Sequence, residues 1–147
     1  MRAVIQRVRR AGVSVDGAVA GRIGPGLLVF LGVGREDDTE TARRLAEKVA
    51  ALRIFPDAAD KMNRSVRDAG GEILVVSQFT LYADCRHGHR PAFTAAAPPG
   101  AAEALYRFFV QTLRETGVVV ATGVFGARML VEIENDGPVT IILDTGG

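Results

Sequence analysis

The sequence predicts an α+β protein in which a curved, mainly antiparallel sheet, barrel-like in shape, packs against two main helices. Three observations support this class. Short apolar runs typical of strands recur along the chain, and only two longer segments carry apolar residues at helical spacing. An Asp-Gly pair between two of these runs is a strong signal for a β-hairpin. We therefore expect about seven or eight strands in one sheet-based domain.

The N-terminal strands follow from alternation and turn signals. Residues 3–8 alternate between two faces and predict a first strand. A second strand over 12–15 meets the turn Asp16-Gly17, and residues 18–23 form the return strand of that hairpin. The continuous apolar run 27–33 then predicts a fully buried strand.

The first helix is expected after a capping signal. Asp37 is followed three residues later by Glu40, which is similar to a capping box and places the start of the helix there. Pro56 lies beyond its end. One apolar stripe at helical spacing faces the core and consists of Ala42, Leu45, Ala46, Val49 and Leu52.

A buried strand over 73–76 runs directly into a polar segment in the second half of the chain. The second helix follows Pro98-Pro99 and stops at Gly117. Its expected inward residues are Ala101, Leu105, Phe108, Phe109 and Leu113.

The C-terminal part is expected to consist of strands again. Residues 118–121 and 129–134 predict two of them, and residues 139–143 predict a third. Between the last two, residues 135–138 are interpreted as a turn.

Length and composition define the general class. The 147 residues form a single domain, residues 1–147, which can hold a core without disulfides. The net charge of +1 indicates no strong basic field, so any RNA contact must come from a local patch. The single cysteine, the absence of a signal-peptide core and the short apolar stretch 24–34 favour the cytoplasm and no membrane contact.

Three segments have residues that could carry chemistry. Residues 77–82 place hydroxyls, an amide and backbone N–H groups at a sheet edge, where sites are commonly built. By periodicity alone, a strand end with local hydrogen bonds is the simpler interpretation. Asn135-Asp136-Gly137-Pro138 taken by itself indicates a hairpin turn.

The third candidate segment, residues 85–90, contains Cys85, His87 and His89, which are all the cysteine and histidine residues of the chain. Thiol or metal chemistry would need this loop to be extended and neighbouring carboxylates to complete a metal shell. Its two arginines could hold RNA phosphates, and a solvated basic loop explains them equally well. The chain has no Gly-x-Ser-x-Gly elbow, His-Glu-x-x-His helix or phosphate-binding glycine loop, so a hydrolase here is not of a familiar type.

Together these segments resemble the D-aminoacyl-tRNA deacylase family from end to end. The two signature motifs stand in the family's order, as Ser77-Gln78-Phe79-Thr80-Leu81 and Asn135-Asp136-Gly137-Pro138-Val139-Thr140. Further matches are Ala3-Val4-Ile5-Gln6-Arg7-Val8, Arg53-Ile54-Phe55 and Lys61-Met62-Asn63. The chain departs from the family at His87, usually a permanent cation, and at Ala92, usually serine, which concerns tRNA contact and not the family.

The resemblance implies a homodimer with two active sites at the subunit interface, an aminoacyl-tRNA substrate, and neither cofactor nor metal ion. The residues implied to line the pocket for the terminal aminoacyl-adenosine are Ser77, Gln78, Phe79 and Thr80, with Phe125 and Met129 at the adenosine end.

The implied reaction is hydrolysis of an ester between an amino acid and a ribose hydroxyl, which needs a positioned water and a stabilised oxyanion. Backbone N–H groups around Phe79 and Thr80 could supply the latter. Thr80 is the candidate nucleophile by residue type, but no base is evident beside it. We therefore favour hydrolysis assisted by the neighbouring ribose hydroxyl, with Thr80 in a positioning role.

The resemblance also implies that Gly137-Pro138 is cis and enters the pocket of the partner subunit. Reading one methylene gains only about 1–3 kcal/mol, so rejection of L-amino acids is better explained by rigid atoms placed where an L side chain would project. Such a filter should accept glycine, so glycyl-tRNA mischarged on tRNA-Ala is an expected further substrate.

Two other hypotheses remain open. The chain could be a non-catalytic tRNA- or nucleic-acid-binding module on the same fold, which turnover of a D-aminoacyl-tRNA would exclude. It could also be a metal- or thiol-dependent enzyme at Cys85, His87 and His89, which a metal assay would test.

Overall fold

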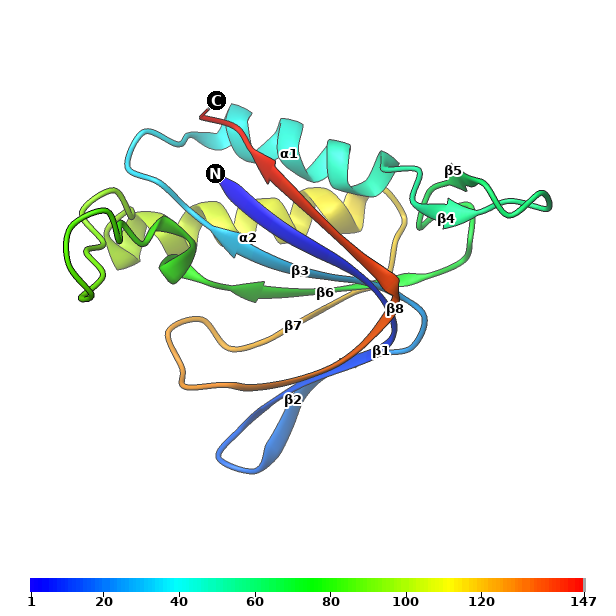
Figure 1. Cartoon of the computed structure of the whole chain (residues 1–147), viewed down its shortest axis with the longest axis horizontal. Coiled ribbons are helices and arrows are strands. Elements are labelled where there is room, and N and C mark those ends of the chain that lie inside the picture. The colour runs from blue at the N-terminus through cyan, green and yellow to red at the C-terminus, as the bar shows by residue number, and fades with distance from the viewer. Residues whose placement is uncertain (147) are drawn as a thin grey trace.

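The computed structural model describes residues 1–146 and has a six-stranded mixed sheet at its centre (Figure 1). Strand β1 (Arg2–Val15) is the middle of this sheet. It pairs antiparallel with β3 (Gly26–Gly32) along its first half and with β2 (Ala18–Ile23) along its second half. Strand β8 (Leu130–Asp144) pairs with β1 along nearly its whole length.

The remaining sheet strands are parallel to their neighbours. β6 (Glu72–Ser77) pairs with β3, and β7 (Val120–Thr122) pairs with β6. The sheet curves until β2 meets β7: a Cβ on Gly21 would lie 2.4 Å from the carbonyl oxygen of Thr122. The α+β class and the barrel-like sheet are thus confirmed, with two parallel pairings and three antiparallel ones within residues 1–146.

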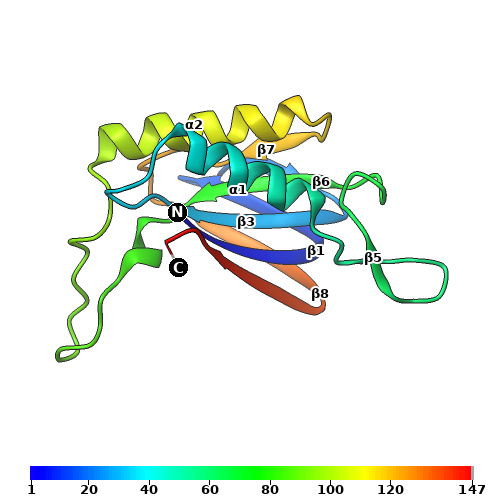
Figure 2. The same ribbon diagram turned by 90° about the horizontal axis from the view of Figure 1, so that it is seen from above.

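Two helices, α1 (Thr39–Ala51) and α2 (Pro99–Glu115), lie over one face of the sheet (Figure 2). Their apolar sides form the main core with that face. A smaller apolar cluster fills the opposite, concave side. Beyond α1, the short strands β4 (Phe55–Pro56) and β5 (Met62–Arg64) form a separate ribbon. No helix within residues 1–146 is long and apolar enough to cross a membrane.

The N-terminal hairpin has the predicted turn. Asp16 and Gly17 have φ angles of 50° and 81°, which are the left-handed values that an Asp-Gly hairpin turn requires. The strands predicted over 3–8 and 12–15, however, are one continuous strand, since Arg10 and Ala11 also pair with β8 and Ala11 with β2.

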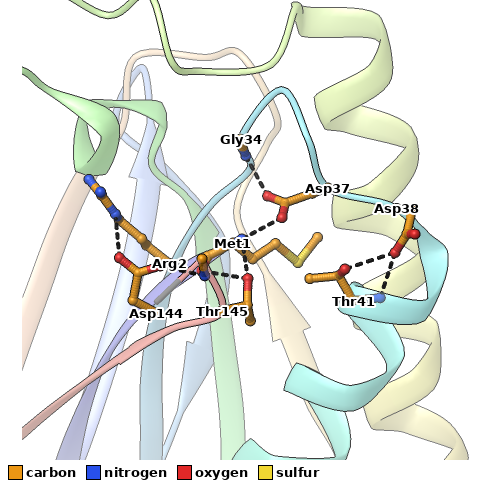
Figure 3. A network of polar contacts seen from close by, with 9 residues as sticks. Met1, Arg2, Gly34, Asp37, Asp38, Thr41, Asp144 and Thr145 are labelled. Atoms are coloured by element: carbon orange, nitrogen blue, oxygen red, sulfur yellow. Dashed lines mark hydrogen bonds and ion pairs between the residues drawn. The ribbon is translucent and has the colours of Figure 1, made fainter.

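The start of α1 differs from the prediction by one residue. The N-cap is Asp38, whose side chain accepts a hydrogen bond from the backbone N–H of Thr41 at 2.8 Å. Asp37 is already engaged: its carboxylate accepts from the Met1 ammonium at 2.6 Å and from the Gly34 N–H at 2.6 Å (Figure 3). The expected stripe is otherwise buried, with Ala50 added and Leu52 as the C-cap.

The inward face of α2 is also shifted. Ala101 is exposed and Leu105 and Phe108 are only partly buried, whereas Phe109 and Leu113 are buried as predicted. Ala102, Tyr106 and Val110 complete the buried side. Apolar residues occur nearly all round this helix, so spacing alone did not identify its inward side. Gly117, with φ of 92°, follows the helix end as expected.

The turn predicted at residues 135–138 is wrong, because β8 is a single strand. Its pairing shifts from Val8–Asn135 to Gln6–Thr140, so residues 136–139 bulge out opposite Arg7. Both halves pair with the long β1 instead of with each other. Asn135 closes the bulge, since its side-chain amide bonds to both the N–H and the carbonyl of Val139 at 3.2 and 3.1 Å. The Gly137-Pro138 bond is cis, as the resemblance implies.

Candidate active site

A cavity of about 610 Å³ opens at the end of the sheet where β3 and β6 terminate. Its walls come from the end of β6, the start of α2 and the loop before β8. The segment between Tyr82 and α2 extends from the same end of the molecule as an arm (Figure 2). The lining is mostly apolar, which is typical of a small-molecule site with few polar contacts.

The first signature motif forms one wall of this cavity. β6 ends at Ser77, and a short 3₁₀ helix, η1 (Phe79–Tyr82), follows. Ser77, Gln78 and Phe79 line the cavity, and the Phe79 ring lies edge-on to Phe93 with centroids 5.1 Å apart. A packed aromatic pair of this kind fixes the wall while leaving 58% of Phe79 exposed for a ligand.

Thr80 does not belong to the lining. It is exposed, and its hydroxyl oxygen accepts a hydrogen bond from the side-chain amide of Gln78. Within residues 1–146, the backbone N–H groups of Phe79 and Thr80 donate no hydrogen bond, whereas the N–H of Gln78 donates to Leu31 O at 2.8 Å. Two unengaged amides therefore stand beside the cavity.

The opposite wall contains Phe125 and Met129, which the resemblance places at the adenosine end. The Phe125 ring is tilted against Tyr106 at a centroid distance of 5.7 Å. The Tyr106 ring is fixed against strand β6, because its hydroxyl donates to the carbonyl of Val75 at 3.0 Å. Burial raises the pKa of Tyr106 to about 12, so it is a neutral wall residue near pH 7 and not a base.

The lining provides no general base within the described chain. Its ionisable side chains are Tyr106 and Arg35, and neither accepts a proton near neutral pH. Both histidines lie in the exposed arm, outside the lining. The cavity can therefore position an ester and a water and stabilise an oxyanion, but a proton acceptor must come from the substrate or the solvent.

The second signature motif lies at the other end of the sheet. Gly137 and Pro138 are exposed and do not line the cavity. Their bulge is opposite Arg7, which pairs with Leu27, whereas the cavity begins at Leu31. Four residues of strand are about 13 Å. A chain thus cannot bring its own Gly137-Pro138 into its own cavity without refolding β8.

The bulge is held firmly. The Arg7 guanidinium donates to Asp136 O at 3.1 Å and to Ile54 O at 2.7 Å. Gly137 has φ of 137°, and a Cβ there would lie 2.7 Å from a methyl group of Val139. Position 137 therefore requires glycine, and Arg7 fixes the direction in which the exposed motif points.

Residues 85–92 of the arm, which include Cys85, His87 and His89, are exposed. Asp84 and Ala92 close its base by two backbone hydrogen bonds of 2.7 and 3.0 Å. Arg86 donates to the Asp84 carboxylate, with the Nη2 to Oδ2 distance at 2.7 Å, and these bonds lower the pKa of Asp84 to about 2. In the described part of the chain, no three His, Cys, Asp or Glu side chains lie together as a metal site.

We predict that Cys85→Ser and treatment with a chelator both leave deacylation within tenfold of the untreated wild type. The thiol lies on the exposed arm and outside the cavity. Initial rates on D-tyrosyl-tRNA check this. A larger loss in either case, above about 1.4 kcal/mol, would instead support the metal- or thiol-dependent hypothesis.

A nearly closed mixed sheet, two helices on one face and a mostly apolar cavity at the strand ends define a small α+β protein with a ligand-sized site. A family model described as D-Tyr-tRNA(Tyr) deacylase matches residues 4–144, and the chain belongs to this family. It is thus an enzyme of the deacylase type, and the assignment made from the two motifs is confirmed.

Curated relatives carry the deacylase name, and solved structures share the fold. The D-aminoacyl-tRNA deacylase of Anaeromyxobacter dehalogenans is 63% identical over 145 residues, covering 99% of this chain and 97% of the relative. That of Deinococcus radiodurans is 59% identical over 144 residues, covering 98% and 99%. A solved structure titled c-Myc DNA Unwinding Element Binding Protein has a TM-score of 0.92 at 44% identity, with 99% of both chains covered. A probable eukaryotic D-amino acid tRNA deacylase, at 20% identity and a TM-score of 0.81 with 97% of both chains covered, shares the fold.

Proposed function

We propose that this deacylase hydrolyses the ester of D-aminoacyl-tRNA in the cytoplasm, as a homodimer with an active site at each side of the subunit interface. The observation that carries this proposal is the separation of the two motifs. Ser77, Gln78 and Phe79 line the cavity, whereas Gly137 and Pro138 are exposed at the opposite end of the sheet. A second copy of the chain can bring the two together.

The edge of β8 supports a second copy. Within residues 1–146, β8 pairs with β1 alone, so its other edge is open along 15 residues. Leu130 and Ile142 on this strand are 65% and 70% exposed. Long open edges with exposed apolar side chains promote association, and proteins commonly cover them.

The chemistry follows from the groups beside the cavity. The backbone N–H groups of Phe79 and Thr80 stabilise the oxyanion that forms when water attacks the ester carbonyl. The adjacent ribose hydroxyl orients that water and takes part in proton transfer, because the lining has no general base of its own. Phe125 and Met129 hold the adenosine, and Thr80 positions Gln78 through their hydrogen bond.

Selectivity comes from the partner's Gly137-Pro138. The motif projects from a bulge that Arg7 holds in place, so its atoms are rigid. In the partner's cavity it accepts the substrate ammonium through carbonyl oxygens and leaves no room for an L-Cβ. D-amino acids of many sizes pass this filter, as does glycine, which makes glycyl-tRNA mischarged on tRNA-Ala a further substrate.

A mixed dimer tests whether the motif acts in the partner. Gly137→Ala damages the motif, and Ala127→Trp fills the cavity from its loop. Each variant alone should lose activity. A dimer of the two has one site with an intact cavity and an intact motif, so an equal mixture refolded together should regain about a quarter of wild-type activity.

The control is the double variant, Gly137→Ala with Ala127→Trp in one chain, mixed with wild type. In an equal mixture, a quarter of the dimers are wild type and give a quarter of the activity. The mixed dimers should add none, because each of their sites has either the damaged motif or the filled cavity. If the mixture of the two single variants stays inactive while circular dichroism shows each variant folded, Gly137-Pro138 serves its own chain. If Gly137→Ala alone stays active, the motif serves no site.

Nucleic-acid binding without turnover is the second candidate, because a solved structure with a DNA-binding title is 44% identical to this chain. Release of free D-tyrosine from D-tyrosyl-tRNA by catalytic amounts of protein supports the deacylase proposal. Stoichiometric binding with no release would favour the second candidate.

A further inference from the structure

The rim of the cavity carries one cationic side chain whose role the proposed reaction leaves open. Arg35 is the only charged residue of the lining within residues 1–146, and the lining contains no carboxylate. A single positive charge beside an otherwise neutral and mostly apolar cavity favours an anionic part of the ligand at that point.

The backbone of Arg35 is fixed on both sides. Its N–H donates to Ala95 O at 3.1 Å, and Gly34 and Ala96 form a β-bridge. On the other side, Asp37 holds the turn by accepting from the Gly34 N–H, and Asp37 is in turn bound to the Met1 ammonium (Figure 3). The turn that carries Arg35 is therefore preorganised before any ligand arrives.

The guanidinium group of Arg35 is oriented by a hydrogen bond but is not paired with a carboxylate. Its Nε donates to the carbonyl of Thr94 at 2.5 Å, which orients the planar group. No carboxylate within residues 1–146 lies within salt-bridge distance of it. The four N–H bonds on Nη1 and Nη2 are thus left for a ligand, in the fork geometry that matches a phosphate. By contrast, Arg86 in the neighbouring arm is already paired with Asp84.

We propose that Arg35 binds the phosphate on the 5′ side of the nucleoside whose ester lies in the cavity, an inference that rests on the proposed function. The cavity accepts the aminoacyl-nucleoside, which carries no phosphate, and the first phosphodiester of the RNA strand then leaves it past Arg35. Arg35 is a positioning residue: it holds the RNA strand and does not touch the reacting ester.

The test compares two small substrates that differ by this phosphate alone, the 3′-D-tyrosyl esters of adenosine and of adenosine 5′-phosphate. Wild type should cleave the phosphorylated ester with a kcat/KM at least tenfold higher, mainly through KM. Arg35→Gln should abolish this preference by lowering kcat/KM on the phosphorylated ester at least tenfold. Arg67→Gln, an exposed arginine outside the cavity, should keep the preference and is the matched control.

Salt dependence on D-tyrosyl-tRNA gives a second readout. Loss of one phosphate contact to a single strand should flatten the slope of log kcat/KM against log salt by roughly 0.7. If Arg35→Gln keeps the preference for the phosphorylated ester, another group reads the phosphate. If it slows both esters equally, Arg35 only supports the wall through Thr94. Either result overturns the assignment.

Failure of the proposed function has a different signature, since wild type would then cleave neither ester. Calorimetric titration with adenosine 5′-phosphate and with adenosine still tests Arg35 in that case. Wild type should bind the phosphate form more tightly and Arg35→Gln should bind both equally; an unchanged preference in the variant would overturn the assignment.

Discussion

A D-tyrosyl-tRNA whose terminal 2′-hydroxyl is replaced by hydrogen, with the amino acid on the 3′ oxygen, should be deacylated about 100-fold or more slowly than the normal substrate. Thr80→Ala should remain within about tenfold of wild type. Within residues 1–146 the cavity lining contains no side chain that accepts a proton near pH 7, so the ribose hydroxyl is the group that can act on the water. Thr80 is exposed and bonds to Gln78, and loss of one hydrogen bond costs about 1 kcal/mol.

Single-turnover rates at saturating enzyme separate this loss from weaker binding. Thr80→Ser is the control, because it retains the hydroxyl that accepts from Gln78. A normal rate on the deoxy substrate together with an inactive Thr80→Ala would mean that Thr80 attacks the ester, and the RNA-assisted mechanism would be wrong.

The parts of the fold that local chemistry determines could be predicted. The hairpin at Asp16-Gly17 depends on two left-handed residues, and the buried strands β3 and β6 are continuous apolar runs. The parallel pairing of β3 with β6 depends on the chain crossing through α1, which periodicity does not report. Whether two strands pair in parallel is decided by the tertiary fold and not by the local sequence.

Two local signals were overridden by distant partners. Residues 135–138 have the composition of a turn, but the 14-residue β1 offers a partner to both flanking segments, so a bulge forms within one strand. Asp37 has the residue type of an N-cap, but it binds Met1 and Gly34, and Asp38 caps α1 instead. β1 and Met1 both lie far in sequence from the residues that they engage.

The cavity brings together most of the residues that the resemblance implies for the pocket. Ser77, Gln78, Phe79, Phe125 and Met129 all line the cavity, whereas Thr80 lies beside it. Arg35 and Tyr106 were missed, because an arginine after a strand and a tyrosine on an apolar helix have no distinguishing local pattern. The arm residues Cys85, His87 and His89 lie outside the cavity.

The second large effect is expected in the deacylation rate of glycyl-tRNA. If Gly137-Pro138 of the partner only excludes an L-Cβ, the filter tests for that carbon and for nothing else. Glycine has no Cβ and enters in the pose of a D-amino acid. We therefore expect glycyl-tRNA to be deacylated on the order of 100-fold or more faster than L-alanyl-tRNA. The two substrates differ by one methyl group, and a pocket that bound this methyl group favourably would gain only about 1–3 kcal/mol.

Single-turnover deacylation of glycyl-, L-alanyl- and D-alanyl-tRNA at equal enzyme concentration tests steric exclusion most directly. Exclusion predicts that D-alanyl- and glycyl-tRNA are both hydrolysed while L-alanyl-tRNA decays at the rate seen without enzyme. A pocket that selects by gripping the D side chain would treat glycine and L-alanine alike, since neither fills the D position. Glycyl-tRNA as inert as L-alanyl-tRNA would contradict the exclusion model and would make Gln78 and Phe79 the residues that read the side chain.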